Sequence, residues 1–306
     1  LAVGGGLVGL TFSALTEYDP GVSSRHQYQA YYLFDAATGA PRTYFGSCSH
    51  SFQQRLVWDG ARFVGLCLGD AGPRGIGVTA VSRQGEATTR IAFAIKGGDD
   101  STGGAYQNTF SRVGAILPGG LGYALLFSTE NSPVYDVDNV NAPRDLVFMH
   151  IRPDFEKSKP ASTYDVAIAD TADHNFRATG LEVEIHDYFG GSYTGKNHGL
   201  IWLTQFADTS QNAESPKLVR LASGHFIALW EEWTLTAYTA TYGMVIDEYG
   251  NVQVPRTKLG DMRLSRGDDA FALGDGAAWV VGDATVPALV LYTVDEALTV
   301  TRYELR

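Results

Sequence analysis

The strongest constraint on this chain is a short motif that recurs along it. Residues 54–68 read QRLVWDGARFVGLCL, in which two runs of strand-forming residues flank Asp59 and Gly60. An Asp-Gly pair between such runs is a strong signal for a β-hairpin, because the turn needs a positive φ that glycine adopts at little cost. The same order of apolar strand, glycine-containing turn and apolar strand begins near residues 1, 115, 218 and 271.

The spacing of these five hairpins predicts the fold class. Most starts lie 53 to 59 residues apart, and the interval from 115 to 218 is about twice as long. Two more strand-like stretches follow the second hairpin, at 75–86 and 88–97, and a repeat of four strands is typical of a β-propeller blade. We therefore predict an all-β protein, a β-propeller with about 22 strands. Five blades are favoured, six blades are the alternative, and a sandwich of similar hairpins is the competing architecture.

The long interval predicts an insertion within a single domain that spans residues 1–306. Residues 154–198 interrupt the third repeat, and the stretch at 181–199 would form an extra hairpin. If residues 154–198 instead form four regular strands, the protein has six blades. We also expect strands from the two ends of the chain to pair, because a propeller must remove its open sheet edges.

Composition limits the partners and the compartment. The chain has 34 acidic and 23 basic residues, a net charge of −11 and no basic stripe, which argues against a nucleic-acid partner. No apolar run approaches the ~20 residues of a membrane span. Low lysine content and abundant threonine, serine, tyrosine and glycine favour a secreted or extracytoplasmic protein. Because the sequence opens at Leu1 inside a predicted strand, we expect a trimmed N-terminus and no visible signal peptide.

The only two cysteines, Cys48 and Cys67, fall on the two arms of the second predicted hairpin. They are not opposite each other if the turn lies at 59–62. Disulfide geometry is restrictive, so two free thiols are favoured over a disulfide.

An acidic residue ends the second strand of each predicted hairpin. Antiparallel pairing brings these ends, and the starts of the first strands, to one end of the propeller, which we call the rim. The rim acids are Glu17, Asp70, Glu130, Glu231, Glu232 and Asp283. Neighbouring loops and strand starts add His50, Arg74, Asn108, Arg266 and Asp268. The alternative is that strand ends are polar simply because water solvates them.

The rim residues suggest carbohydrate chemistry. Paired carboxylates act as acid and base in glycoside hydrolysis, and the candidate catalytic carboxylates are Glu231, Glu232, Asp70 and Glu130. His50 could instead abstract a proton in a polysaccharide-lyase-type reaction. The candidate ligand-binding residues are Arg74, Arg266, Asp268, Asp283, Asn108 and Glu17, with the arginines suited to carboxylate or sulfate groups. The strict hydrolase, zincin and phosphate-loop motifs are absent from the sequence.

Two metal hypotheses follow from clustered side chains. Asp136, Asp138 and Asn139 offer oxygen ligands of the kind that calcium prefers, so calcium is a possible cofactor, although a plain polar turn is favoured. His174, His186 and His198 lie in or beside the insertion and could bind zinc, although ordinary surface histidines are favoured.

Several stretches together resemble secreted bacterial proteins of unassigned function. They are SHSFQQRLVWDG with GDAGPRGI, and later IWLTQ, SPKLVRL and IALWEEW, and the resemblance covers residues 47–76 and 200–283. The resemblance implies a β-propeller and an extracellular setting, and it carries no catalytic residues. We predict an extracellular ligand-binding propeller that recognises a glycan at an acidic central site. The alternatives are a glycoside hydrolase or polysaccharide lyase that uses the same rim, and a structural or adhesion module.

Overall fold

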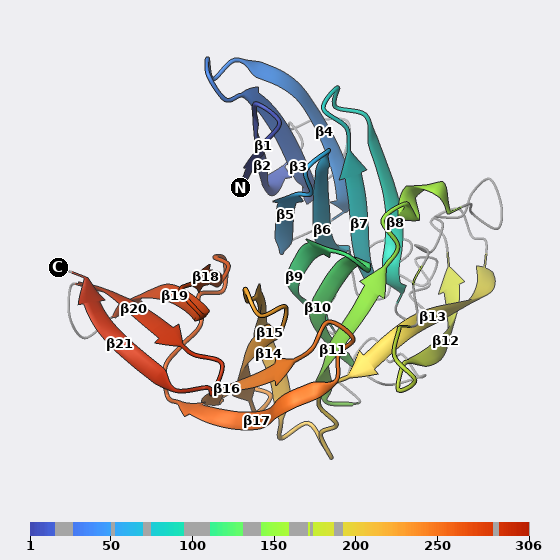
Figure 1. Cartoon of the computed structure of the whole chain (residues 1–306). Helices are drawn as coiled ribbons and strands as arrows, with labels where there is room; N and C mark the ends of the chain where they lie inside the picture. Colours follow the sequence, from blue (N-terminus) through green and yellow to red (C-terminus); the bar gives the residue numbers. More distant parts are fainter. Residues whose placement is uncertain are drawn as a thin grey trace.

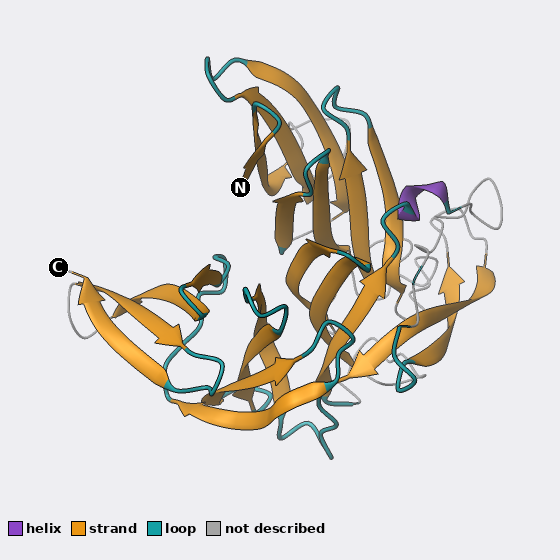
Figure 2. Ribbon diagram, viewed as in Figure 1, coloured by secondary structure: helices purple, strands orange, loops and turns teal. Residues whose placement is uncertain are grey.

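The structure is a computed structural model. It describes residues 1–15, 27–49, 53–69, 75–94, 111–130, 142–158, 171, 174–186, 192–283 and 288–305. These residues are almost entirely β-structure, and the helical turn η2 (Phe155–Lys157) stands out from the strands in Figure 2. No helix in the described part of the chain is long and apolar enough to cross a membrane.

The strands form five separate antiparallel sheets, which confirms the prediction of a five-bladed β-propeller. Blade 1 contains β1 (Ala2–Gly4), β2 (Leu7–Leu15), β3 (Gln27–Asp35) and β4 (Pro41–Ser49). Blade 2 contains β5 (Gln54–Trp58), β6 (Phe63–Gly69), β7 (Gly75–Val81) and β8 (Ala87–Ala94). Blade 3 contains β9 (Ser111–Gly119), β10 (Gly122–Glu130), β11 (Arg144–Ile151), β12 (Thr179–His186) and β13 (Ser192–Trp202). Blade 4 contains β14 (Asn212–Arg220), β15 (Phe226–Trp233), β16 (Tyr238–Ile246) and β17 (Val252–Gly260). Blade 5 contains β18 (Phe271–Leu273), β19 (Gly276–Asp283), β20 (Ala288–Val294) and β21 (Val300–Leu305).

Each predicted hairpin forms the two innermost strands of a blade. In the second hairpin, β5 and β6 pair from Gln54 with Cys67 to Trp58 with Phe63, and Gly60 has φ 103° in the turn. The other four hairpins pair in the same way, as β1 with β2, β9 with β10, β14 with β15 and β18 with β19. Innermost strands of neighbouring blades contact each other, as β9 does with β5 and β14. The repeated hairpin therefore builds the centre of the propeller.

Apolar side chains fill the junctions between neighbouring blades. At the junction of blades 2 and 3, the rings of Phe93 and Phe127 lie 5.2 Å apart and both are buried. All seven residues of β6 are buried because blades 1 and 3 cover both faces of blade 2. A strand covered on both faces reads as a continuous apolar run rather than as an alternating one, as β6 does.

Blade 3 carries a fifth strand. Its strand order is β12-β13-β11-β10-β9, so β13 follows β11 in the sheet and β12 lies outermost. β12 pairs with β13 from Thr179 with Leu200 to His186 with Ser192. These two strands come from the region 154–202, and they add to the third sheet rather than forming a sixth blade.

The structure corrects the prediction that the two cysteines are free. Cys48 and Cys67 form a disulfide with their Cα atoms 6.3 Å apart. The sequence interpretation placed both on one hairpin, whereas Cys48 lies on β4 of blade 1 and Cys67 lies on β6 of blade 2. The disulfide therefore connects two blades. The pairing of residues within the β5–β6 hairpin does not determine whether it can form, because only Cys67 belongs to that hairpin.

The five blades form an open arc around a common axis (Figure 1). An opening separates blade 1, which contains the N-terminus, from blade 5, which contains the C-terminus. The prediction that strands from the two ends of the chain pair is wrong for the described residues, because each sheet contains strands from one continuous part of the chain.

Candidate functional site

The rim of blade 4 holds Glu231 and Glu232 on opposite faces of β15, as the alternation of a strand requires. Glu231 is buried and accepts hydrogen bonds from Arg263 at 2.8 and 3.1 Å and from the backbone N–H of Leu264 at 2.8 Å. The Arg263 guanidinium in turn lies over the rings of Trp233 and Tyr238, at 4.8 and 4.6 Å. Glu231 thus anchors the chain that leaves blade 4.

Glu232 points toward blade 3 and has its own arginine. Arg256 donates to both of its carboxylate oxygens, at 2.7 and 2.6 Å, and Trp230 Nε1 donates at 3.1 Å. Arg256 also lies over the Tyr242 ring, 4.3 Å from its centroid. Two adjacent glutamates in the sequence therefore end in two separate bidentate ion pairs, one on each face of blade 4.

A third carboxylate links blades 3 and 4. Glu214 on β14 accepts a hydrogen bond from Arg112 of β9 at 2.6 Å and forms an ion pair with Arg144 of β11. Glu130 is buried and lies opposite Arg144 in the register of β10 and β11. The acids of this part of the rim are therefore interleaved with arginines.

The loop between blades 4 and 5 reaches the centre of the propeller. Asp269 forms an ion pair with Arg55 at the start of β5, with Oδ1 and Nε 2.5 Å apart. Lys217 of β14 donates a hydrogen bond to the backbone carbonyl of Asp268 at 2.6 Å. Arg55 also donates to the Gly114 carbonyl of β9 at 2.8 Å. This loop therefore contacts the innermost strands of blade 2, through Arg55, and of blade 4, through Lys217.

Lys217 is the most perturbed basic group of this centre. Its side chain is buried, and this burial lowers its pKa to about 7, with the positive charge of Arg55 acting in the same direction. The carboxylates of Asp269, Asp268 and Glu231 act in the opposite direction and do not offset the burial. Near neutral pH the amine is therefore close to its titration midpoint.

A cavity of about 320 Å³ opens beside this loop. Its polar lining comes from three places: Thr11 of blade 1, Gln53, Gln54 and Arg55 at the start of blade 2, and Arg266 and Asp269 of the loop. Leu1, Leu56 and Gly267 complete the lining. Gln54 Nε2 donates to the Ser13 hydroxyl at 2.7 Å, and the side-chain oxygen Oε1 of Gln53 accepts from the Val113 N–H at 2.8 Å. We call this cavity the axial pocket. Its nine lining residues are Leu1, Thr11, Gln53, Gln54, Arg55, Leu56, Arg266, Gly267 and Asp269.

The predicted rim residues have different fates in the structure. Glu17, His50, Asp70, Arg74 and Asn108 lie outside the described residues, as does the side chain of Asp283, whose backbone ends β19. Arg266 lines the axial pocket, and Asp268 hydrogen-bonds to Ser265 at the edge of the same loop. Glu231 and Glu232 do not share a site, because they face different blades.

The metal hypotheses find no support in the described ranges. No three His, Cys, Asp or Glu side chains there form a group that could hold an ion. Asp136, Asp138 and Asn139, and the side chain of His186, lie outside the description. His198 is exposed, and His174 packs against His150 with their rings 5.4 Å apart. Burial lowers the pKa of His150, whose Nε2 pairs with the Glu248 carbonyl.

Sequence reasoning missed Arg55, Gln54 and Thr11 as lining residues. All three lie in the strands of the first two predicted hairpins, and the rim prediction did not include them. The usable signal was the run of polar residues Gln53, Gln54 and Arg55 directly before the apolar part of the second hairpin.

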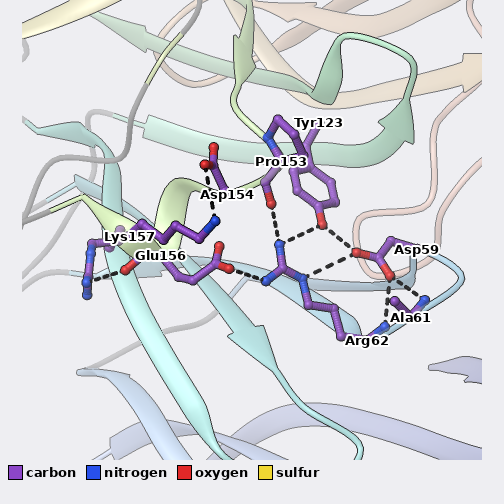
Figure 3. Close-up of polar contacts among 9 residues, drawn as sticks. Asp59, Ala61, Arg62, Tyr123, Pro153, Asp154, Glu156 and Lys157 are labelled. Carbon is purple, nitrogen blue, oxygen red and sulfur yellow. Dashed lines mark hydrogen bonds and ion pairs between the residues drawn. The ribbon is translucent and has the colours of Figure 1, made fainter.

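A second polar cluster joins blades 2 and 3 around the Asp59 turn, which lies at the end of β5 and β6 opposite Gln54 and Cys67. Figure 3 shows its side chains. Arg62 pairs with Glu156 at 2.7 Å and donates to Tyr123 Oη at 3.2 Å and to the Pro153 carbonyl. Tyr123 donates to Asp59 Oδ2 at 2.5 Å. Burial and the hydrogen bond to Asp59 raise the pKa of Tyr123 to about 12. Burial alone would raise the pKa of Asp59, but the hydrogen bonds that it accepts outweigh burial and lower it.

This cluster is a structural joint. Asp59 also accepts hydrogen bonds from the N–H groups of Ala61 and Arg62, each at 2.8 Å, which shapes the Asp-Gly turn. The turn of blade 2 is thereby attached to η2 of blade 3. The Asp59-Gly60 motif thus both turns the chain and joins two blades.

Comparisons with known proteins find no matching family model and no matching curated protein. Among solved structures, an endo-arabinase from Bacteroides thetaiotaomicron is 15% identical, with 97% of this chain and 93% of that chain covered and a TM-score of 0.37. An α-L-arabinanase of Penicillium chrysogenum is 9% identical, with 96% and 92% covered and a TM-score of 0.42. An α-L-arabinofuranosidase of Fusarium graminearum is 10% identical, with 96% and 80% covered and a TM-score of 0.49. At these values the likeness carries neither residues nor activity to this chain.

Proposed function

We propose that this chain is an extracellular ligand-binding propeller that recognises a glycan in the axial pocket. The observation that carries the proposal is that four kinds of polar group line one cavity: hydroxyl, amide, guanidinium and carboxylate. They come from blade 1, from blade 2 and from the loop between blades 4 and 5. Sugar hydroxyls both donate and accept hydrogen bonds, so a mixed set of donors and acceptors suits them. Leu1 also lines the pocket and is 75% exposed, so its side chain offers apolar contact for the C–H face of a sugar ring.

Arg266 favours an acidic sugar. Its side chain is exposed, and it makes no ion pair with any other residue in the described part of the chain. A guanidinium group binds a carboxylate through two parallel hydrogen bonds, which adds both affinity and orientation. We therefore infer that the preferred ligand carries a uronate-type carboxylate, which Arg266 would hold at the mouth of the pocket.

Binding fits the rim better than catalysis does. A carboxylic acid and a carboxylate that work together on a glycosidic bond must both reach the ligand. Glu231 and Glu232 are instead buried, and each is held by an arginine through two hydrogen bonds. Their geometry suits holding the loop and the neighbouring blade in position.

An extracellular setting is consistent with the disulfide between Cys48 and Cys67. Disulfides persist in oxidising compartments and are rare where thiol reductants are abundant. The disulfide joins blades 1 and 2, both of which contribute side chains to the axial pocket.

The test is a titration of the protein with a panel of acidic and neutral oligosaccharides by calorimetry, with reducing-end release followed in parallel. We expect an acidic oligosaccharide to bind without being cleaved, and R266A to weaken that binding about tenfold or more. R152A is the matched control, because Arg152 is also an exposed arginine but pairs with Asp154. Figure 3 shows Asp154 beside the polar cluster of Arg62 and Glu156, away from the axial pocket. Absence of binding across the panel would overturn the proposal, and cleavage that E231Q or E232Q abolishes would replace it with the enzyme alternative.

A further inference from the structure

Blade 5 leaves an apolar sheet face uncovered. Trp279 and Val281 of β19 pack toward blade 4, so the intervening side chains of this strand point the other way, toward the opening of the arc. On that face, Phe271 is 44% exposed, Leu289 is 54% exposed and Tyr303 is 50% exposed. Strand register makes the face continuous, because Phe271 lies opposite Ala278, and Leu289 lies opposite both Gly282 and Leu305.

Blade 1 leaves a matching face uncovered at the other end of the arc. Ala2 and Leu7 pack toward blade 2, so Val3 and the even-numbered side chains of β2 point toward the opening. Val3 is 60% exposed and Phe12 is 42% exposed. Phe12 stacks on Tyr32 with ring centroids 5.5 Å apart, and Tyr32 stacks on Phe34 at 6.1 Å. The result is an aromatic and aliphatic sheet face in contact with water.

The covered blades show what such faces are for. On blade 4, the face toward blade 5 carries Ile227, Leu229 and Val245, and none of these is exposed. On blade 2, the face toward blade 1 carries Phe63 and Val81, which are equally buried. The uncovered faces of blades 1 and 5 carry the same kinds of aliphatic and aromatic side chains, but no neighbouring blade that the structure describes packs on them. Contiguous apolar surface of this kind marks an interaction site on a soluble protein.

We propose that the uncovered face of blade 5 binds the uncovered face of blade 1 of a second copy of this chain. We call the face of a blade that is directed toward the next blade in the chain its forward face, and the face directed toward the preceding blade its backward face. Each junction within the protein packs the forward face of one blade against the backward face of the next. Blade 5 has a free forward face and blade 1 has a free backward face, so a contact between two copies continues the interface that the molecule already uses four times. The contact is heterologous, so it repeats from copy to copy and builds chains or closed rings.

The test measures mass against concentration by light scattering coupled to size exclusion, and by sedimentation. Wild-type protein should associate as its concentration rises. L289D places a charge on the forward face, F12D places one on the backward face, and each should weaken self-association about tenfold or more. A mixture of the two variants should restore binding and stop at a one-to-one dimer, because each variant keeps the face that the other lacks.

The matched control is L235D. Leu235 is 55% exposed in the β15–β16 turn, on neither face, so this variant should associate like the wild type. Circular dichroism and urea unfolding of all variants would verify that each is folded. A wild-type protein that stays monomeric overturns the proposal, as does a mixture that fails to dimerise. Monomers destabilised by both L289D and F12D would show instead that blades 1 and 5 close on each other within one chain.

Discussion

Arg55 Nε and Asp269 Oδ1 lie 2.5 Å apart, although Arg55 lies on β5 of blade 2 and Asp269 lies in the loop before blade 5. The arginine side chain is buried and the aspartate side chain is more than half exposed. The pair therefore ties a surface loop to the centre of the propeller. Because Arg55 and Asp269 both line the axial pocket, this pair also sets the shape of the proposed binding site.

Replacing Asp269 by alanine should release this loop. Arg55 keeps its hydrogen bond to Gly114, so we expect a modest loss of about 2 kcal/mol in the free energy of unfolding. Hydrogen exchange of residues 265–270 should become faster, because the loop loses its side-chain anchor. D261A is the control in the same connection, since Asp261 is largely exposed and should leave exchange unchanged. Equal exchange in D269A and wild type would contradict this role.

Replacing Arg62 by alanine should weaken the joint between blades 2 and 3. The variant leaves Glu156 and Asp59 without their arginine, and hydrogen bonds to charged groups are worth about 1.5–3 kcal/mol. Urea unfolding at neutral pH should therefore show a loss of about 3 kcal/mol. The comparison is R42A, which breaks the exposed pair with Asp35 and should cause little change. Similar losses in both variants would contradict a specific role for the joint.

Lys217 should make the free energy of unfolding change with pH between about 7 and 10.5. Its pKa falls from 10.5 to about 7 on folding, so between these values the unfolded chain binds more protons than the folded one. Stability therefore rises with pH across this window, by at most about 1.4 kcal/mol per pH unit. K217M removes the titrating group and should flatten the profile between pH 7 and 10. The measurement is urea unfolding at several pH values, and an unchanged slope in K217M would argue against the lowered pKa.

Asp145 should act in the opposite direction at acidic pH. Burial raises its pKa from 3.8 to about 6, against hydrogen bonds from the Phe206 N–H and the Thr204 hydroxyl. Between pH 4 and 6 the folded protein binds more protons than the unfolded chain, so stability from this group falls as pH rises. D145N keeps an oxygen acceptor without the charge. It should match wild type near pH 4 and exceed it at pH 7, and a variant less stable at pH 7 would contradict the prediction.

Reducing the disulfide should destabilise the junction of blades 1 and 2. Cys48 and Cys67 are 19 residues apart in the sequence, and closing a loop of this length stabilises a protein by about 3 kcal/mol in the chain-entropy description. The double variant C48S/C67S should show a loss of similar size in urea unfolding, and reductant should then have no further effect. Equal stability of oxidised and reduced wild type would contradict the contribution of this bond.

The repeated hairpin could be predicted because its determinants are local. The Asp59-Gly60 turn and the apolar runs on either side act within about ten residues, and five copies at a regular spacing lead to five blades. The position of Arg266 at the rim could also be predicted, because strand polarity alone assigns it to that end. These features need no knowledge of which blades touch.

The remaining features depend on which side chains meet across blade junctions, and only the tertiary structure decides that. The disulfide of Cys48 with Cys67 joins two sheets, and the separate arginine partners of Glu231 and Glu232 come from different stretches of chain. The axial pocket needs blade 1, blade 2 and the loop before blade 5 at once. The hairpin pattern determines the blade, whereas the packing of blades determines the charge partners, the cross-link and the site, because these contacts join residues that are distant in sequence.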